Sequence, residues 1–144
     1  YSGRKKLQGY CEGLESRGVA VRQELIHLFN EDKMSVPLVR DYLLRLHESG
    51  LRFDAVLSSE DILAVGAAKY ARVVHHSIPK QLRIIGYNNS NFCLCCEPEL
   101  TSVDNRLNAL CSHCVTTMLG VLEGREMPQR TGVTAELVRR GSTL

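Results

Sequence analysis

The stretch from Phe53 to Tyr70 constrains the fold more than any other part of the chain. A short apolar run, Phe53–Leu57, is followed by two serines, two acids and a long segment rich in alanine and glycine. This order predicts a buried strand, a tight turn and a helix that packs flat on a sheet. We expect Ser58 and Ser59 to cap the helix and Gly66 to allow a close approach between helix and strand.

The rest of the chain repeats this alternation of strand and helix. Apolar runs predict strands within Val19–Phe29, Phe53–Leu57, Leu82–Tyr87, Leu100–Val103 and Gly132–Arg139. Apolar residues at helical spacing predict buried helix faces over Leu7–Leu14, Val39–Leu46 and Leu107–Leu122. The alternation favours right-handed βαβ units, and therefore an α/β fold with a mostly parallel sheet flanked by helices.

Several shorter signals refine this prediction. Ser35 followed by Pro37 predicts the start of a helix, and Asp104 or Asn105 is expected to cap the long helix that follows. Gly9 and Gly13 lie within the first helix, where we expect them to face a crowded contact. Residues 30–33 are expected to form a polar loop.

Composition narrows the class of protein. The chain has 144 residues, of which 44% are hydrophobic, and a net charge of +2, so it suits one globular domain or part of one. This charge is too small to predict a nucleic-acid surface in this segment. The first ten residues do not form a signal peptide, and no stretch is long enough to span a bilayer. The chain does not begin with methionine, so we expect part of a longer protein. Its cysteines, if reduced, lead us to expect a cytoplasmic one.

The six cysteines raise the question of disulfides or a metal. They are Cys11, Cys93, Cys95, Cys96, Cys111 and Cys114. Because the chain has enough apolar residues to fold without disulfides, reduced thiols are the better interpretation. A structural zinc site is the lesser alternative, since the Cys111-x-x-Cys114 spacing lies on a predicted buried helix face, where cysteine acts as a small hydrophobe. We therefore expect no metal and no cofactor.

The polar residues favour ligand binding over catalysis. No nucleophile elbow, P-loop or Gly-x-Gly-x-x-Gly motif is present, so we do not expect an enzyme. Polar clusters lie at Lys6, at Ser59-Glu60-Asp61 and at Asn88-Asn89, next to predicted strand ends or helix starts. Glu60 and Asp61 could simply complete a helix cap. If the strands are parallel, however, the last two clusters share one edge of the sheet, as a site for a polyhydroxylated ligand requires.

Five segments, in order, carry a resemblance to a known family. They are Lys6-Leu7-Gln8-Gly9-Tyr10, Glu60-Asp61 followed by Ala64-Val65-Gly66-Ala67, Pro79 followed by Ile84-Ile85-Gly86-Tyr87-Asn88, Pro98-Glu99-Leu100-Thr101-Ser102-Val103, and Leu137-Val138-Arg139-Arg140-Gly141-Ser142-Thr143. On these segments the chain resembles the second half of the effector-binding domain of the LacI/GalR family of bacterial transcriptional regulators.

The resemblance implies a type I periplasmic-binding-protein-like fold with two α/β lobes and a ligand cleft between them. Residues 1–144 would form most of the C-terminal lobe, and residues 103–127 would cross into the other lobe. The implied function is to sense a small sugar-like effector, dimerise, and control DNA binding by a separate helix-turn-helix domain. The implied ligand-binding residues are Lys6, Glu60, Asp61, Asn88 and Asn105.

Three positions depart from the family pattern. Lys6 stands where the family has arginine, Glu60 where it has asparagine, and Asn88 where it has aspartate. We therefore expect a ligand unlike the common free hexoses. The alternative function is a periplasmic sugar-binding protein of a transporter, which shares the fold.

Without the other lobe, the apolar face over Leu107–Leu122 would lack its partner. We expect it to fold back on this chain or to pack against another copy by exchange.

Overall fold

The computed structural model describes residues 2–29 and 34–144, so the polar loop expected at 30–33 lies outside the described residues. The helices are α1 (Ser2–Glu15), α2 (Val36–Glu48), α3 (Asp61–Val73) and α4 (Leu107–Leu122), with short 3-10 turns η1 (Gln23–Leu25) and η3 (Asn91–Cys95). The strands are β1 (Ala55–Leu57), β2 (Arg83–Tyr87), β3 (Thr101–Asp104) and β4 (Glu136–Val138).

The four strands form one sheet in the order β1-β2-β3-β4. β1 pairs with β2 and β2 with β3 in parallel, with Val56 opposite Ile84 and Gly86 opposite Ser102. β4 runs antiparallel to β3. The mostly parallel α/β sheet predicted from the sequence is confirmed, and the carboxyl ends of β1, β2 and β3 meet at one edge.

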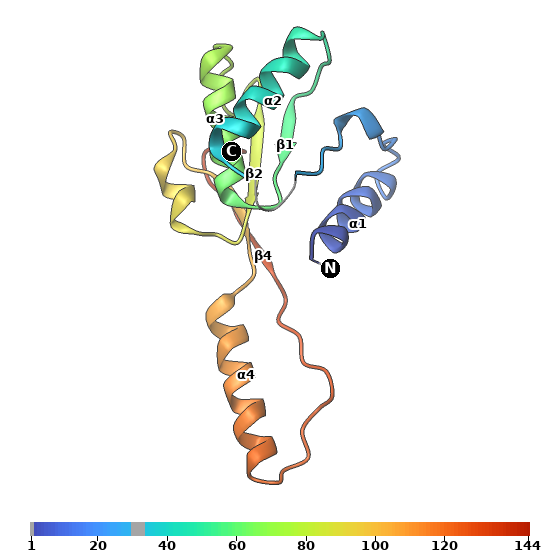
Figure 1. Ribbon diagram of the computed structural model, residues 1–144, viewed down its shortest axis with the longest axis vertical. Helices are drawn as coiled ribbons and strands as arrows, with labels where there is room; N and C mark the ends of the chain where they lie inside the picture. The colour runs from blue at the N-terminus through green and yellow to red at the C-terminus, as the bar shows by residue number, and fades with distance from the viewer. Residues whose placement is uncertain (1, 30–33) are drawn as a thin grey trace.

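The core lies between the sheet and the helix pair α2 and α3, which lie together in Figure 1. The small residues of α3 are the reason that these helices pack so closely. A Cβ on Gly66 would lie 2.7 Å from Val39 Cβ and 2.8 Å from the Val36 carbonyl oxygen, both in α2. Gly66 therefore serves a helix–helix contact, and the expectation of a close helix–strand contact is wrong.

Of the three helix N-caps predicted from the sequence, the structure confirms one. Ser35 caps α2 as expected, because its Oγ accepts the Leu38 N–H at 3.3 Å. Ser58 and Ser59 do not cap α3: Glu60 occupies the N-cap position and makes no side-chain cap. α4 likewise begins after Arg106 without a side-chain cap, so neither Asp104 nor Asn105 occupies the cap position expected of it.

The N-terminal segment differs most from expectation. No strand forms among residues 19–29; the 3-10 turn at Gln23–Leu25 and extended chain take its place. A strand needs a neighbour to accept its backbone hydrogen bonds, and within the described residues no backbone hydrogen bond joins this stretch to another strand. Gly9 and Gly13 are also not crowded, since nothing within 4 Å would meet a Cβ at either position.

α4 and its return segment extend away from the sheet (Figure 1). The apolar face of α4 is exposed: Met118 is 57% accessible, Val121 61% and Leu122 76%. The expectation that this face folds back on the chain is therefore wrong, and its alternative, packing against another copy by exchange, stays a prediction. The helix contacts its own return segment, where Met127 packs on Gly120 and a cavity of about 370 Å³ lies between α4 and residues 128–133. In the described part of the chain, every helix is too short or too polar to cross a bilayer.

Candidate ligand-binding site

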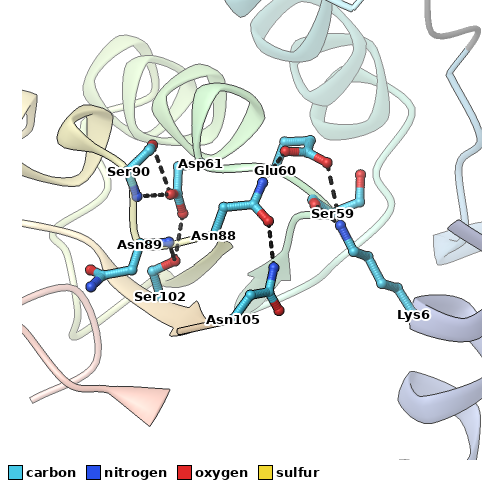
Figure 2. Close-up of polar contacts among 9 residues, drawn as sticks. All are labelled: Lys6, Ser59, Glu60, Asp61, Asn88, Asn89, Ser90, Ser102 and Asn105. Atoms are coloured by element: carbon cyan, nitrogen blue, oxygen red, sulfur yellow. Dashed lines mark hydrogen bonds and ion pairs between the residues drawn. The ribbon is translucent and has the colours of Figure 1, made fainter. Parts of the chain in front are cut away.

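Polar side chains from three consecutive strand ends meet at the carboxyl edge of the sheet. Glu60 follows β1, Asn88 follows β2 and Asn105 follows β3, and Lys6 reaches the same place from α1 (Figure 2). We call Lys6, Glu60, Asn88 and Asn105 the polar edge. The parallel sheet is what brings these four residues together, since they lie up to 99 positions apart in the sequence.

Lys6 is held at the polar edge by three contacts. Its Nζ donates to the Ser59 carbonyl at 2.8 Å and lies 3.3 Å from Glu60 Oε1. The same ammonium lies 4.1 Å from the centre of the Tyr87 ring, which is within the range of a cation–π contact. The Lys6 side chain is only 17% exposed, so its positive charge is placed by the protein before any ligand arrives.

Within the polar edge, Asn88 connects Glu60 with Asn105. Its Nδ2 donates to Glu60 Oε2, and its Oδ1 accepts from Asn105 Nδ2 at 2.7 Å. The backbone of Asn88 has a φ of 97°, a left-handed conformation that asparagine tolerates better than most residues. Lys6, Glu60, Asn88 and Asn105 therefore form one continuous chain of polar contacts (Figure 2).

Asp61 lies behind this chain and is 1% exposed. Its Oδ2 accepts the Ser90 N–H at 2.7 Å and the Ser90 hydroxyl at 2.8 Å, and its Oδ1 accepts the Ser102 hydroxyl at 2.6 Å. Gly86 leaves the space for this carboxylate, because a Cβ there would overlap Asp61 Oδ1. The structure thus places four of the five candidate residues along one edge and Asp61 beneath them.

Asn89 lies in the turn that follows β2 and is held there by three hydrogen bonds. Its backbone N–H donates to Ser102 Oγ at 3.0 Å, and its Nδ2 donates to Asp104 Oδ2 at 3.0 Å. Arg140 Nη2 donates to Asn89 Oδ1 at 2.7 Å. Hydrogen bonds from the Arg106 backbone and from Asn89 lower the pKa of Asp104.

Sequence reasoning missed the supporting residues Ser90, Ser102 and Arg140. The only signal for two of them was that Ser102 and Arg140 lie within segments of the family resemblance.

The cysteines show no arrangement that favours a metal. Burial, followed by the nearby Asp61 carboxylate, raises the pKa of Cys93 to about 11. Cys111 and Cys114 are exposed on α4, so the prediction that they are buried on that helix is wrong for this chain. Within residues 2–29 and 34–144, no group of three or more histidine, cysteine or acidic side chains is placed to hold a metal ion.

An α/β lobe with polar side chains at the carboxyl ends of its parallel strands has the geometry of a small-ligand-binding domain. Comparison with known proteins makes the class specific, because residues 1–143 match the family described as the periplasmic binding protein-like domain. The chain belongs to this family.

The relatives are transcriptional regulators. The chain is 36% identical to an HTH-type transcriptional regulator of Lachnoclostridium phytofermentans, over 99% of this chain and 42% of that protein. It is 24% identical to the regulator AscG of Escherichia coli, over 97% and 41%. A solved LacI-family regulatory protein from Chloroflexus aggregans superimposes with a TM-score of 0.87 at 25% identity, over 98% of this chain and 50% of that one.

These relatives confirm the resemblance to LacI-type regulators and the periplasmic-binding-protein-like fold. They are named as regulators and not as enzymes, as expected, and they do not favour the transporter alternative. The chain spans less than half the length of the two curated relatives described here.

Proposed function

We propose that this chain is the effector-sensing and dimerisation module of a LacI-type bacterial transcriptional regulator. In this proposal a small, polar, sugar-like metabolite binds at the polar edge and changes DNA binding by a separate helix-turn-helix domain. The single observation that carries the proposal is the chain of contacts Lys6–Glu60–Asn88–Asn105 across the ends of three parallel strands. The family membership supports it independently.

The chemistry of the polar edge suits a neutral ligand with several hydroxyl groups. A hydroxyl both donates and accepts, so it can replace either partner in the amide pair of Asn88 and Asn105. The charge of Lys6 is already balanced by Glu60, so an anionic ligand would have to approach an adjacent carboxylate. The replacement of the family's arginine, asparagine and aspartate at these positions also leads us to expect a ligand other than a common free hexose.

The proposal extends to the assembly. We propose a cytoplasmic homodimer, or a domain-exchanged oligomer, that contacts DNA only through a domain outside this chain and does not bind a membrane. Two exposed apolar side chains on η3 support a contact with a second copy, because Phe92 is 47% and Leu94 58% accessible.

We further propose that residues 103–127 cross into a second lobe, which covers the exposed apolar face of α4. Closure of the two lobes on the effector then favours one DNA-binding state, by as much as the effector binds the closed state more tightly.

Ligand binding can be tested by thermal denaturation of the natural full-length protein with ribose, cellobiose, cytidine, glucose and glucose 6-phosphate. At about 100 times its dissociation constant a bound ligand adds about 2.7 kcal/mol of stability, which raises the melting temperature by several degrees. We expect this rise with at least one of ribose, cellobiose and cytidine, which carry several hydroxyl groups and are not free hexoses. Glucose, a free hexose, and its anionic phosphate should give a smaller rise.

Matched variants give the test its specificity. Lys6→Met should abolish the rise, whereas Lys5→Met should keep it, because Lys5 contacts Gln8 on the solvent side of α1. A rise with none of the five compounds, a rise with the phosphate alone, or an unchanged rise in Lys6→Met would contradict the proposal.

The place of α4 can be tested by limited proteolysis with chymotrypsin, which cuts after aromatic residues, leucine and methionine. In the full-length protein we expect α4 to be protected and the protein to run as a dimer in light scattering. In the isolated chain 1–144 we expect cleavage within α4, since Leu122 and Met118 are accessible there. Equal cleavage of α4 in both would show that no second lobe covers it.

A further inference from the structure

Two connections attach α4 to the sheet. The outgoing connection runs through Asp104 and Arg106 into α4, and the returning connection enters β4 and continues to Arg140. Figure 1 shows both passing the same end of the sheet before the arm extends away. Whatever fixes these connections sets the direction of α4 relative to the polar edge.

The outgoing connection is held from the turn that follows β2. Asn105 Nδ2 donates to Asn88 Oδ1 at 2.7 Å, and Asn89 Nδ2 donates to Asp104 Oδ2 at 3.0 Å. The other oxygen of Asp104 accepts the Arg106 N–H at 2.6 Å. Arg106 itself has a φ of 52°, a left-handed conformation that is uncommon for arginine and persists only when neighbouring contacts hold it.

The strand that receives the returning connection, β4, is held from the same turn through Arg140, two residues beyond its end. Arg140 Nη2 donates to Asn89 Oδ1 at 2.7 Å, while its Nη1 donates to the Leu100 carbonyl at 2.8 Å. The Arg140 backbone N–H also donates to Thr101 Oγ1 at 2.9 Å. Asn89 therefore uses both ends of one amide, the nitrogen for the outgoing connection and the oxygen for the returning one.

We propose that Asn88 and Asn89 form a two-part clasp on the α4 arm. Asn88 holds only the outgoing connection, through Asn105, and this bond lies in the polar edge where a ligand hydroxyl competes for it. Asn89 holds both connections, through Asp104 and Arg140, away from that competition. Asn89, Asp104 and Arg140 are then positioning residues that keep the arm attached while the ligand changes the Asn88–Asn105 bond. The clasp rests on the proposed function only for the identity of the competing ligand.

Hydrogen–deuterium exchange in the natural full-length protein, without any ligand, tests which connection each of the two asparagines holds. Asn105→Ala should raise exchange in residues 104–110 by about threefold or more and leave residues 136–141 unchanged. Asn89→Ala should raise exchange in both segments. Asn91→Ala is the matched control, because Asn91 lies just beyond the turn on an exposed part of η3 and should change neither segment.

A general loss of stability would also raise exchange in α3, so the peptide covering Asp61–Val73 is the internal reference and should stay unchanged. If Asn89→Ala does not fold, Arg140→Lys keeps the charge but loses the planar fork that donates to both Asn89 and the Leu100 carbonyl, and it should raise exchange in 136–141 alone. The clasp is refuted if Asn105→Ala loosens both segments or neither, or if the Asn89 or Arg140 variants leave 136–141 unchanged.

Addition of ribose, cellobiose or cytidine then tests the link to the ligand. In the natural protein the compound that raises the melting temperature should alter exchange in 104–110 more than in 136–141, and this difference should vanish in Asn105→Ala. A difference that persists in Asn105→Ala refutes the competition. If no compound binds, the proposed function fails, and the clasp is judged by the ligand-free variants.

Discussion

Replacement of Gly86 by alanine is the sharpest test of how the polar edge is supported. Gly86 lies in β2 opposite Ser102, and Asp61 lies directly over it. A new Cβ would overlap Asp61 Oδ1 and approach Asp61 Cα to 3.2 Å. The Asp61 side chain cannot move outward without giving up hydrogen bonds, because both oxygens accept from Ser90 or Ser102.

The magnitude follows from these contacts. Overpacking a buried site costs about 1–3 kcal/mol, and the loss of a buried hydrogen bond to a charged group costs about 1.5–3 kcal/mol. Gly86→Ala should therefore lower the free energy of unfolding by about 2.5–6 kcal/mol, a large part of the 5–15 kcal/mol typical of a folded domain. Urea denaturation of the full-length protein, followed by circular dichroism, measures this change.

Gly13→Ala is the control for this prediction. Gly13 lies in α1 with nothing within 4 Å of a new Cβ, so alanine there should stabilise the helix by about 0.5–1 kcal/mol. The two substitutions add the same methyl group and should act in opposite directions. A loss below about 1 kcal/mol for Gly86→Ala would mean that Asp61 moves freely, and that it does not hold the turn after β2 in place.

Two further predictions concern stability. Ser142 is fully buried, and its Oγ accepts the Thr101 N–H at 2.8 Å and donates to the Ile84 carbonyl in β2. Ser142→Ala should therefore lower the free energy of unfolding in urea by about 1–3 kcal/mol, whereas the exposed Ser16→Ala should lower it by less than about 0.5 kcal/mol. Burial and Arg45 lower the pKa of His27 from 6.5, so the unfolded chain takes up this proton more readily as the pH falls. The free energy of unfolding should therefore drop from pH about 7.5 to about 5.5, and His27→Gln should remove part of that drop; an identical drop in the variant would disprove the assignment.

The sheet could be predicted from the sequence because its strands have strong local signals. The run Leu82–Tyr87 is apolar and bounded by polar turns, and the structure has β2 at Arg83–Tyr87. The run ending at Phe29 has a similar composition but forms no strand, because strand formation depends on a neighbouring strand that composition does not reveal. Local pattern thus predicts which segments are apolar, whereas the partner decides which become strands.

The candidate site shows the same contrast between what the local sequence reveals and what depends on distant parts of the chain. Glu60, Asn88 and Asn105 were found because the ends of parallel strands share an edge, which is a property of topology. Asn89 and Arg140 lie 51 residues apart, and their hydrogen bond depends on the path of β4 back from α4. No short-range pattern encodes that path, so sequence reasoning placed Asn89 in a polar cluster but missed its partner Arg140.

The buried position of Asp61 explains why an acid stands there. It is the first residue of α3, where the positive end of the helix dipole favours a negative charge. Three donors from Ser90 and Ser102 converge on its two oxygens, and a carboxylate can accept all of them, whereas an amide would present one N–H₂ group to a donor. The buried charge therefore fixes the turn after β2, and through Asn88 and Asn89 that turn fixes both the polar edge and the base of the α4 arm.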